Sequence, residues 1–186
     1  MPTTSVVPGS LAAIAGQGSG SIAQTFINCD AIILIDTSGS METVDSGFAT
    51  SRYDRACSEL AKLQKTLPGK IGVINFSTIA IFCPGGRPEL LGAGTNLARA
   101  LKFVHVADNC GISFIVISDG HPDSEREALD EAKKFKSPIS CIHIGTEGGD
   151  GSRFLRDLAT ASGGKFGAHA AAQDLAIGIQ RLLTAV

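Results

Sequence analysis

The stretch that decides the fold is Ala31-Ile-Ile-Leu-Ile-Asp-Thr-Ser-Gly-Ser-Met41, in which an apolar run ends in one carboxylate and two hydroxyls. The apolar run is short and β-branched, which predicts a strand buried on both faces. Gly39 permits a tight turn where this strand stops. Asp36, Ser38 and Ser40 can then converge as hard oxygen donors, and Mg²⁺ or Mn²⁺ is the natural occupant of such a group.

Two further stretches carry oxygen donors in similar positions. Thr95 follows Gly94 at the start of a predicted helix, and Asp119 precedes Gly120 after the apolar run Ser113-Phe-Ile-Val-Ile-Ser118. The three stretches, in this order, resemble the metal-ion-dependent adhesion site of von Willebrand factor A domains, the family that includes integrin I domains. The resemblance covers residues 30 to 186.

The resemblance implies a specific ligand set for one Mg²⁺ or Mn²⁺ ion. The hydroxyls of Ser38, Ser40 and Thr95 would bind the ion directly, and the carboxylates of Asp36 and Asp119 would bind it directly or through water. The alternative is structural: the carboxylates cap loops, and the hydroxyls satisfy backbone groups.

Strands and helices are expected to alternate along the chain. This alternation predicts an α/β fold: a doubly wound, Rossmann-like, mainly parallel six-stranded sheet with one short antiparallel edge strand and helices on both faces. The three donor stretches would meet at the carboxyl edge of such a sheet, where ligands bind in doubly wound folds. The expected strands are residues 31–36, 71–76, 79–82, 114–118, 139–144 and 165–168.

Apolar spacing and capping residues predict the helices. Thr95 is expected to be the N-cap of the helix that it opens, and Asp123 or Ser124 the cap of the helix after Asp119. The expected helices are residues 51–67, 95–105, a segment around 125–135, 152–161 and 171–184.

Residues 1–28 are rich in Ser, Thr, Gly and Ala and are expected to form a flexible or loosely packed leader before a von Willebrand factor A-type domain at residues 29–186. The alternative is that Leu11, Ile14, Ile22 and Phe26 pack against the edge of the sheet.

The composition of the chain argues against several classes of function. The net charge of −2, with no clustered basic face, gives no case for nucleic acid. No stretch approaches the roughly 18 apolar residues of a membrane span. The first basic residue is Arg52, so a signal peptide is not expected. Five cysteines without disulfide spacing are expected to be thiols in a reducing compartment, which favours the cytoplasm.

The resemblance implies a binding module and not an enzyme. Such domains bind a partner protein through an Asp or Glu that completes the metal coordination, and small bacterial relatives work beside AAA-type ATPases in intracellular complexes. The alternative is a metal-assisted hydrolase or phosphotransferase on the same scaffold. Position 38 is Ser, which departs from the Asp-x-Asp arrangement of phosphoaspartyl phosphatases.

Three other residues could carry chemistry. His121 could be a general base, although a place on the rim of the site is the simpler interpretation. Cys141 and His143 share one face of a strand and could bind zinc, but the chain offers no second Cys/His pair.

Overall fold

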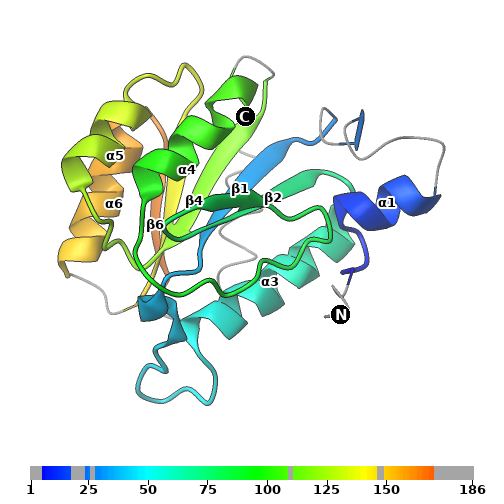
Figure 1. Ribbon diagram of the computed structural model, residues 1–186, viewed down its shortest axis with the longest axis horizontal. Coiled ribbons are helices and arrows are strands. Elements are labelled where there is room, and N and C mark those ends of the chain that lie inside the picture. The colour runs from blue at the N-terminus through cyan, green and yellow to red at the C-terminus, as the bar shows by residue number, and fades with distance from the viewer. Residues whose placement is uncertain (1–5, 18–23, 26–27, 109–110, 146–148, 170–186) are drawn as a thin grey trace.

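A computed structural model describes residues 6–17, 24–25, 28–108, 111–145 and 149–169. Its centre is a six-stranded sheet with the strand order β3-β2-β1-β4-β5-β6 (Figure 1). All neighbouring strands are parallel except β2 and β3, which are antiparallel. The predicted fold class is therefore confirmed. The strands are β1 Ala31–Asp36, β2 Ile71–Phe76, β3 Ala80–Phe82, β4 Ser113–Ser118, β5 Ile139–Ile144 and β6 Phe166–His169.

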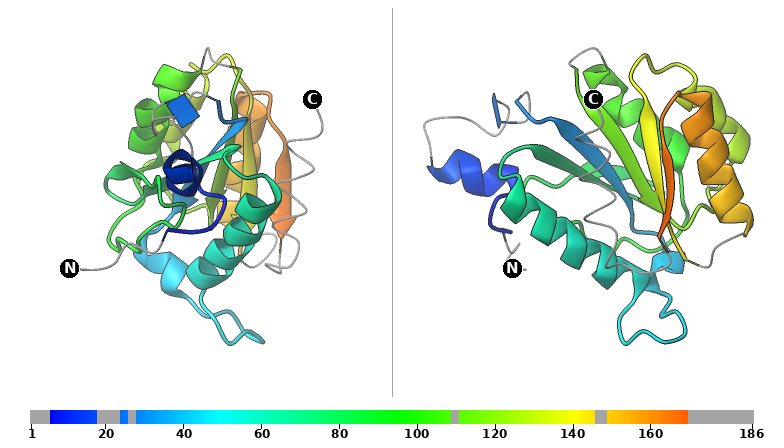
Figure 2. Two further views of the ribbon diagram at one scale, coloured as in Figure 1. Left: turned by 90° about the vertical axis from the view of Figure 1, so that its right-hand side faces the viewer. Right: turned by 180° about the vertical axis from the view of Figure 1, so that it is seen from behind.

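Helices cover both faces of the sheet (Figure 2). Helix α3 (Arg52–Thr66) packs on one face, and α4 (Leu97–Val104), α5 (Glu125–Ala132) and α6 (Asp150–Ala161) contribute to the core on the other face. Within the described part of the chain, no helix is long and apolar enough to cross a membrane. The shorter helices are α1 (Leu11–Gln17), η1 (Gly39–Glu42) and η2 (His105–Ala107).

The central strand β1 divides its side chains between two cores. Ile32 and Leu34 belong to the core under α4, α5 and α6, whereas Ile33 and Ile35 belong to the core under α3. All four side chains are fully buried. Because successive side chains of a strand point to opposite faces, a strand covered on both faces must be apolar at every position.

Helices α3, α4 and α5 each begin after a residue whose side chain caps the helix, and one prediction about these caps is wrong. Thr95 is not the N-cap of α4: Asn96 is, and its side chain accepts a hydrogen bond from the backbone N–H of Arg99 at 2.9 Å. The backbone N–H of Thr95 instead donates to Asp123 Oδ1, which fixes Thr95 outside the helix. Ser124, one of the two predicted caps, is the N-cap of α5.

Strands β1, β2 and β5 have the predicted bounds, and several other boundaries differ from the prediction by one or two residues. Helix α3 begins one residue later than expected because Ser51 is its cap, and α6 begins two residues earlier, at Asp150. Strand β3 begins at Ala80, β4 at Ser113 and β6 at Phe166. The predicted helix at residues 171–184 lies outside the described residues.

The described part of the N-terminal segment packs against the domain. Leu11 is only 2% exposed and belongs to the core, as the alternative interpretation predicted for this residue. The backbone N–H of Ala12 donates to the carbonyl of Pro84 at 2.8 Å, and Ile14 lies beside Gly69. Ile22 and Phe26 lie outside the described residues.

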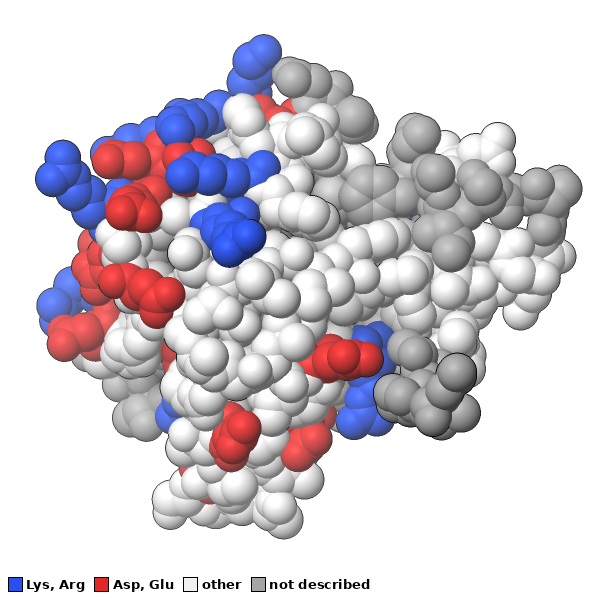
Figure 3. All heavy atoms as spheres, viewed as in Figure 1, with Lys and Arg blue, Asp and Glu red and all other residues white. Residues whose placement is uncertain are grey.

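Charged side chains of α4 and α5 are of both signs and pair across the surface. Lys102 and Lys134 both approach Glu131, at 3.5 and 2.6 Å, and Lys133 approaches Asp130 at 3.6 Å. Figure 3 shows Lys and Arg interspersed with Asp and Glu over these helices. This face therefore presents no field of a single sign.

The cysteines that the structure describes fit the thiol prediction. Cys57, Cys83 and Cys141 are free thiols, and Cys57 and Cys141 are buried. Burial raises the pKa of Cys57 and of Cys83 to about 11, and raises that of Cys141 too. Thiols with raised pKa values are poor nucleophiles and poor metal ligands near neutral pH. Cys110 lies outside the described residues.

The first turn of α6 crosses the end of β4 at very close range. A Cβ atom on Gly151 would lie 2.1 Å from the carbonyl oxygen of Asp119. A Cβ atom on Gly120, whose φ is +83°, would lie 2.1 Å from the carbonyl oxygen of Gly151. Both positions need glycine, because each distance is far below van der Waals contact with backbone that cannot rotate away.

Replacing Gly151 with alanine should therefore lower the free energy of unfolding by about 2–3 kcal/mol, because the backbone of α6 or of Asp119 must move. Urea unfolding of the purified protein measures this change. Gly16→Ala is the matched control: Gly16 lies in α1 with nothing within 4 Å of its added Cβ, so this variant should be at least as stable as wild type. Equal stability of the two variants would contradict the close crossing.

Candidate metal centre

Asp36 ends β1 with a carboxylate that is fully buried and held at both oxygens. The backbone N–H of Ser38 donates to Oδ1 at 2.9 Å. The hydroxyl of Ser118, at the end of β4, donates to Oδ2 at 2.6 Å and accepts from the backbone N–H of Gly120 at 3.0 Å. The Asp36 carboxylate therefore connects the loops that follow two neighbouring strands.

Ser38 and Ser40 lie in the turn that follows Asp36. Their hydroxyl oxygens are 3.1 Å apart, Ser38 being buried and Ser40 exposed. The turn is the 3₁₀ helix η1, and the backbone N–H of Gly39 at its start donates to the carbonyl of Ala93 at 3.3 Å. The two predicted hydroxyl ligands thus lie together, against the loop that carries Thr95.

Thr95 joins this group through its backbone. It is 6% exposed, and its N–H and C=O groups bond to the side chain and backbone of Asp123, at 2.8 and 2.9 Å. A Cβ atom on Gly94 would lie 2.9 Å from the Asp123 carboxylate, so glycine allows the two loops to approach. Three loops therefore meet at the carboxyl edge of the sheet, and they carry all five predicted ligands.

Asp119 is buried, and among the described residues only one of its two carboxylate oxygens has a hydrogen-bond partner. Its Oδ2 accepts from Nη1 of Arg52, the first residue of α3, at 3.3 Å. Its Oδ1 is buried and has no hydrogen-bond partner among the described residues. A buried ionised oxygen without a partner is costly, so a positive group near Oδ1 would be favourable.

Arg52 is a site residue that the sequence analysis missed. It donates to both oxygens of Asp45 through Nε and Nη2, at 2.7–3.2 Å, as well as to Asp119. Arg55 also pairs with Asp45, and the guanidinium of Arg55 lies over the ring of Phe48, 4.0 Å from its centroid. No sequence pattern signals the pair of Arg52 and Asp119, because these residues are 67 positions apart in the chain.

The electrostatics of the site favour a cation. Burial raises the pKa of Asp36 to about 6, and the nearby charge of Asp119 adds to this shift. Its hydrogen bonds from Ser118 and Ser38 act in the opposite direction. Burial lowers the pKa of His143, which pairs with Ser118 in the sheet register and is neutral at pH 7.

The zinc alternative at Cys141 and His143 receives no support from the structure. Cys141 belongs to the apolar core, and His143 lies near Asp119 at the carboxyl edge of the sheet. In the described ranges, no three His, Cys, Asp or Glu side chains form a metal-binding group. The five predicted ligands include only two residues of those types. His121 is exposed beside Gly151, as expected for a rim residue.

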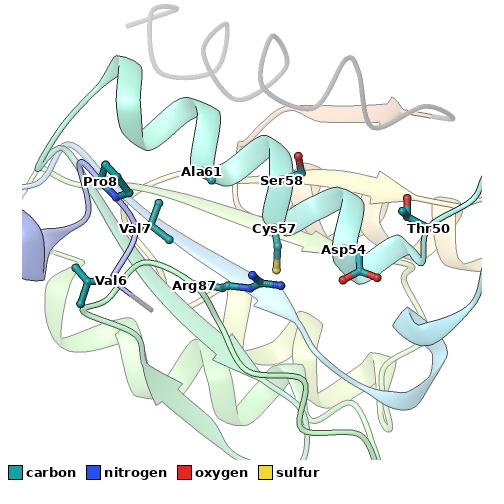
Figure 4. Close-up of a pocket in the computed structure, with 9 residues that line it drawn as sticks. All are labelled: Val6, Val7, Pro8, Thr50, Asp54, Cys57, Ser58, Ala61 and Arg87. Carbon is teal, nitrogen blue, oxygen red and sulfur yellow. The ribbon is translucent and has the colours of Figure 1, made fainter. Parts of the chain in front are cut away.

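A separate pocket lies away from the predicted ligands. It has a volume of about 600 Å³ and is bounded by α3, the N-terminal segment and Arg87 (Figure 4). Asp54 and Arg87 give its wall one charge of each sign, and none of the five predicted ligands lines it.

The donors at the carboxyl edge fit a small divalent cation. They are all oxygens, and they include two buried carboxylates that repel each other when both are ionised. One carboxylate oxygen, Oδ1 of Asp119, has no hydrogen-bond partner in the described part of the chain. Hard oxygen donors are the ligands that Mg²⁺ and Mn²⁺ prefer. Asp36, Ser38, Ser40, Thr95 and Asp119 are the residues that would hold the ion, which would supply a Lewis-acidic position for another oxygen ligand.

The raised pKa of Asp36 predicts how stability depends on pH in the presence of a chelator. Its pKa is about 6 in the folded protein and 3.8 in the unfolded reference, so the folded state binds more protons between these values. The stabilisation that protonated Asp36 gives is present below pH 4 and is lost as pH rises through 6. For this group the loss is about 3 kcal/mol.

Urea unfolding from pH 4 to pH 7 checks this contribution, with Asp36→Asn as the control. The difference in stability between wild type and Asp36→Asn isolates Asp36 from other titrating groups. Between pH 4 and pH 7 it should shift against wild type by about 2–2.5 kcal/mol, because part of the loss has already occurred at pH 4. A difference that stays constant over this range would contradict the raised pKa.

Comparison with known proteins identifies the fold. No protein-family model and no curated protein matches this sequence. Among solved structures, the chain is similar to an aerotolerance-related membrane protein from Bacteroides fragilis NCTC 9343 that carries multiple mutations to serines. The TM-score is 0.64 at 16% identity, over 85% of this chain and all of that chain.

A second similar structure is a von Willebrand factor type A protein from Catenulispora acidiphila. Its TM-score is 0.63 at 17% identity, and the match covers 82% of this chain and 41% of that chain. At these identities the likeness concerns the fold. The strand order, the single antiparallel strand and both structural matches lead to one conclusion: this chain has the fold of a von Willebrand factor A domain.

Proposed function

We propose that this protein binds Mg²⁺ or Mn²⁺ through Asp36, Ser38, Ser40, Thr95 and Asp119 and uses the ion to dock an acidic side chain of a partner protein. The observation that carries the proposal is the buried Oδ1 of Asp119, which lacks a partner among the described residues and belongs to a carboxylate close enough to Asp36 to raise its pKa. A cation would interact with the unpartnered oxygen and would also reduce the repulsion between the two carboxylates.

The chemistry of the ion explains why the partner would be acidic. Mg²⁺ requires six oxygen ligands in an octahedron, and five side chains leave a coordination position for another ligand. Two carboxylates balance the charge of a divalent ion, and the guanidinium of Arg52 adds a positive charge beside Asp119. An incoming Asp or Glu carboxylate would meet a site with excess positive charge.

A binding role is proposed in preference to hydrolysis or phosphotransfer. The two serine hydroxyls face each other within the site, 3.1 Å apart, and neither has a histidine base as a hydrogen-bond partner among the described residues. The buried histidine His143 lies on β5, beside Asp119, whereas the two serines lie in the turn after β1. Turnover of phosphomonoesters or esters that requires Mg²⁺ and Asp36 would reverse this preference.

The partner is proposed to be a protein in the cytoplasm. The paired charges on α4 and α5 in Figure 3 give no basic surface for nucleic acid. Buried thiols fit a reducing compartment. An AAA-type ATPase or one of its clients is the partner class that the resemblance to bacterial von Willebrand factor A domains implies. The part of this proposal that can be tested directly is that the partner presents an Asp or Glu side chain to the ion.

Calorimetric titration of Mn²⁺ and Mg²⁺ into chelator-stripped protein tests the metal site. Wild type should bind about one ion per chain, and Asp119→Ala should weaken binding at least tenfold, because one of two carboxylate ligands is lost. Asp130→Asn is the matched control, since Asp130 is exposed on α5 and pairs with Lys133. Binding by this variant should equal that of wild type.

The docking step is tested separately, by titrating a short glutamate-containing peptide into the Mn²⁺-loaded protein. Binding should disappear with chelator and when glutamine replaces the glutamate. Peptide binding that persists with chelator would overturn the docking role. Absence of Mn²⁺ binding, both alone and with saturating peptide, would overturn the metal site itself.

A further inference from the structure

The pocket bounded by α3, the N-terminal segment and Arg87 has a charged part and an apolar part (Figure 4). Its volume of about 600 Å³ lies within the range of small-molecule sites, roughly 300–1,000 Å³. Asp54 and Arg87 supply the charges, and Thr50 and Ser58 add hydroxyls. The apolar part is lined by side chains of the N-terminal segment and of α3, namely Val6, Val7, Pro8 and Ala61. A ligand that matches both parts must itself be amphiphilic.

The N-terminal segment is a fixed wall of this pocket. The backbone N–H of Val7 donates to the carbonyl of Gly85 at 2.9 Å, and the carbonyl of Gly9 accepts from the N–H of Gly69 at 2.9 Å. A Cβ atom on Gly9 would lie 2.1 Å from the carbonyl oxygen of Gln64, so the segment lies directly against the backbone of α3. The pocket is therefore formed without a ligand, which lowers the entropic cost of binding one.

The charges of Asp54 and Arg87 lie near the same thiol but do not form an ion pair with each other. Burial raises the pKa of the Cys57 thiol to about 11, the charge of Arg87 opposes this shift, and the charge of Asp54 adds to it. Ser51 Oγ donates to Oδ2 of Asp54 at 2.8 Å, and Arg87 lies beside the hydroxyl of Tyr53. Among the described residues, neither charge has an ion-pair partner. The pocket thus offers a cation and an anion that are both available to a ligand.

The chemistry of these two groups indicates the kind of ligand. A guanidinium binds a carboxylate through two parallel hydrogen bonds, and a carboxylate accepts hydrogen bonds from an ammonium group. A ligand with only one charge would leave the other charged residue without a partner and would match the pocket less well. An α-amino acid carries both groups on one carbon atom, beside a side chain that can reach the apolar part. A short peptide carries them at its two ends.

We propose that this pocket binds a zwitterion with an apolar side chain, a free amino acid or a short peptide, whose carboxylate meets Arg87 and whose ammonium group meets Asp54. None of the five proposed ion ligands lines the pocket, so this inference goes beyond the proposed metal-dependent function and does not depend on it. Cys57 serves as a wall of the pocket and not as a nucleophile, because its thiol stays protonated near neutral pH.

Calorimetric titration of L-leucine and of leucyl-leucine into the protein, with chelator present, tests the proposal. At least one of the two probes should bind, and the tighter one identifies the source of the zwitterion. Removing the ammonium charge of that probe by acetylation, or its carboxylate charge by amidation, should weaken binding by at least about tenfold. Glycine and glycyl-glycine, which lack the apolar side chains, should bind more weakly by a similar factor.

Variants of the protein place the site. Arg87→Gln and Asp54→Asn should each weaken binding by at least about tenfold, because each removes one charge and keeps a side chain of similar size. Asp54→Asn also keeps an oxygen that can accept from Ser51. The matched controls are Arg126→Gln and Asp130→Asn, which remove the same charges from α5 and should bind like wild type.

Three results would overturn the proposal: neither probe binds, acetylation or amidation leaves binding unchanged, or Arg87→Gln or Asp54→Asn binds like wild type. The modified probes test both charges on the wild-type protein, so the decision does not depend on whether the variants fold. Because the titrations contain chelator, each of these results would leave the proposed metal-dependent function intact.

Discussion

The burial of β1 on both faces is the constraint on which the rest of the structure depends. Its neighbour β2 pairs with it along its whole length, and β4 pairs with it from Ala31 to Ile35. Helix α3 covers one face, and α4, α5 and α6 cover the other. Each fully buried Ile or Leu of the strand contributes about 1.5–3 kcal/mol through removal from water. The chain after β1 must therefore emerge at the carboxyl edge of the sheet, between two neighbouring loops.

The polar residues at the end of β1 lose their contact with water, which costs free energy. Asp36 is fully buried, and its pKa of about 6 reflects that cost. Hydrogen bonds from Ser38 and Ser118 offset part of it. Oδ1 of Asp119, which has no partner among the residues that the structure describes, adds to it. Groups that are kept buried and incompletely satisfied are typical of sites that bind a ligand, which is why this edge carries the proposed function.

The loops around the site are fixed by contacts that have no sequence signature. Asp45 holds Arg52 and Arg55, Arg52 holds Asp119, and Gly120 and Gly151 allow β4 and α6 to cross at close range. Asp119 is thus held by its side chain from α3 and by its backbone from α6. This double support fixes one oxygen of the carboxylate and leaves the other without a hydrogen-bond partner among the described residues, at the place of the proposed ion.

The sequence by itself determined the fold class and the strands, and it supplied the five residues of the proposed site. The apolar run before Asp36 and the alternation of strands with amphipathic helices are local patterns, and local patterns follow from burial and hydrogen bonding of neighbouring residues. The tertiary structure alone decided that Thr95 lies outside its helix, because Asp123 from another loop binds its backbone and Asn96 caps α4. It alone also decided that Arg52 holds Asp119, since that pair spans 67 residues and depends on how α3 packs on the sheet.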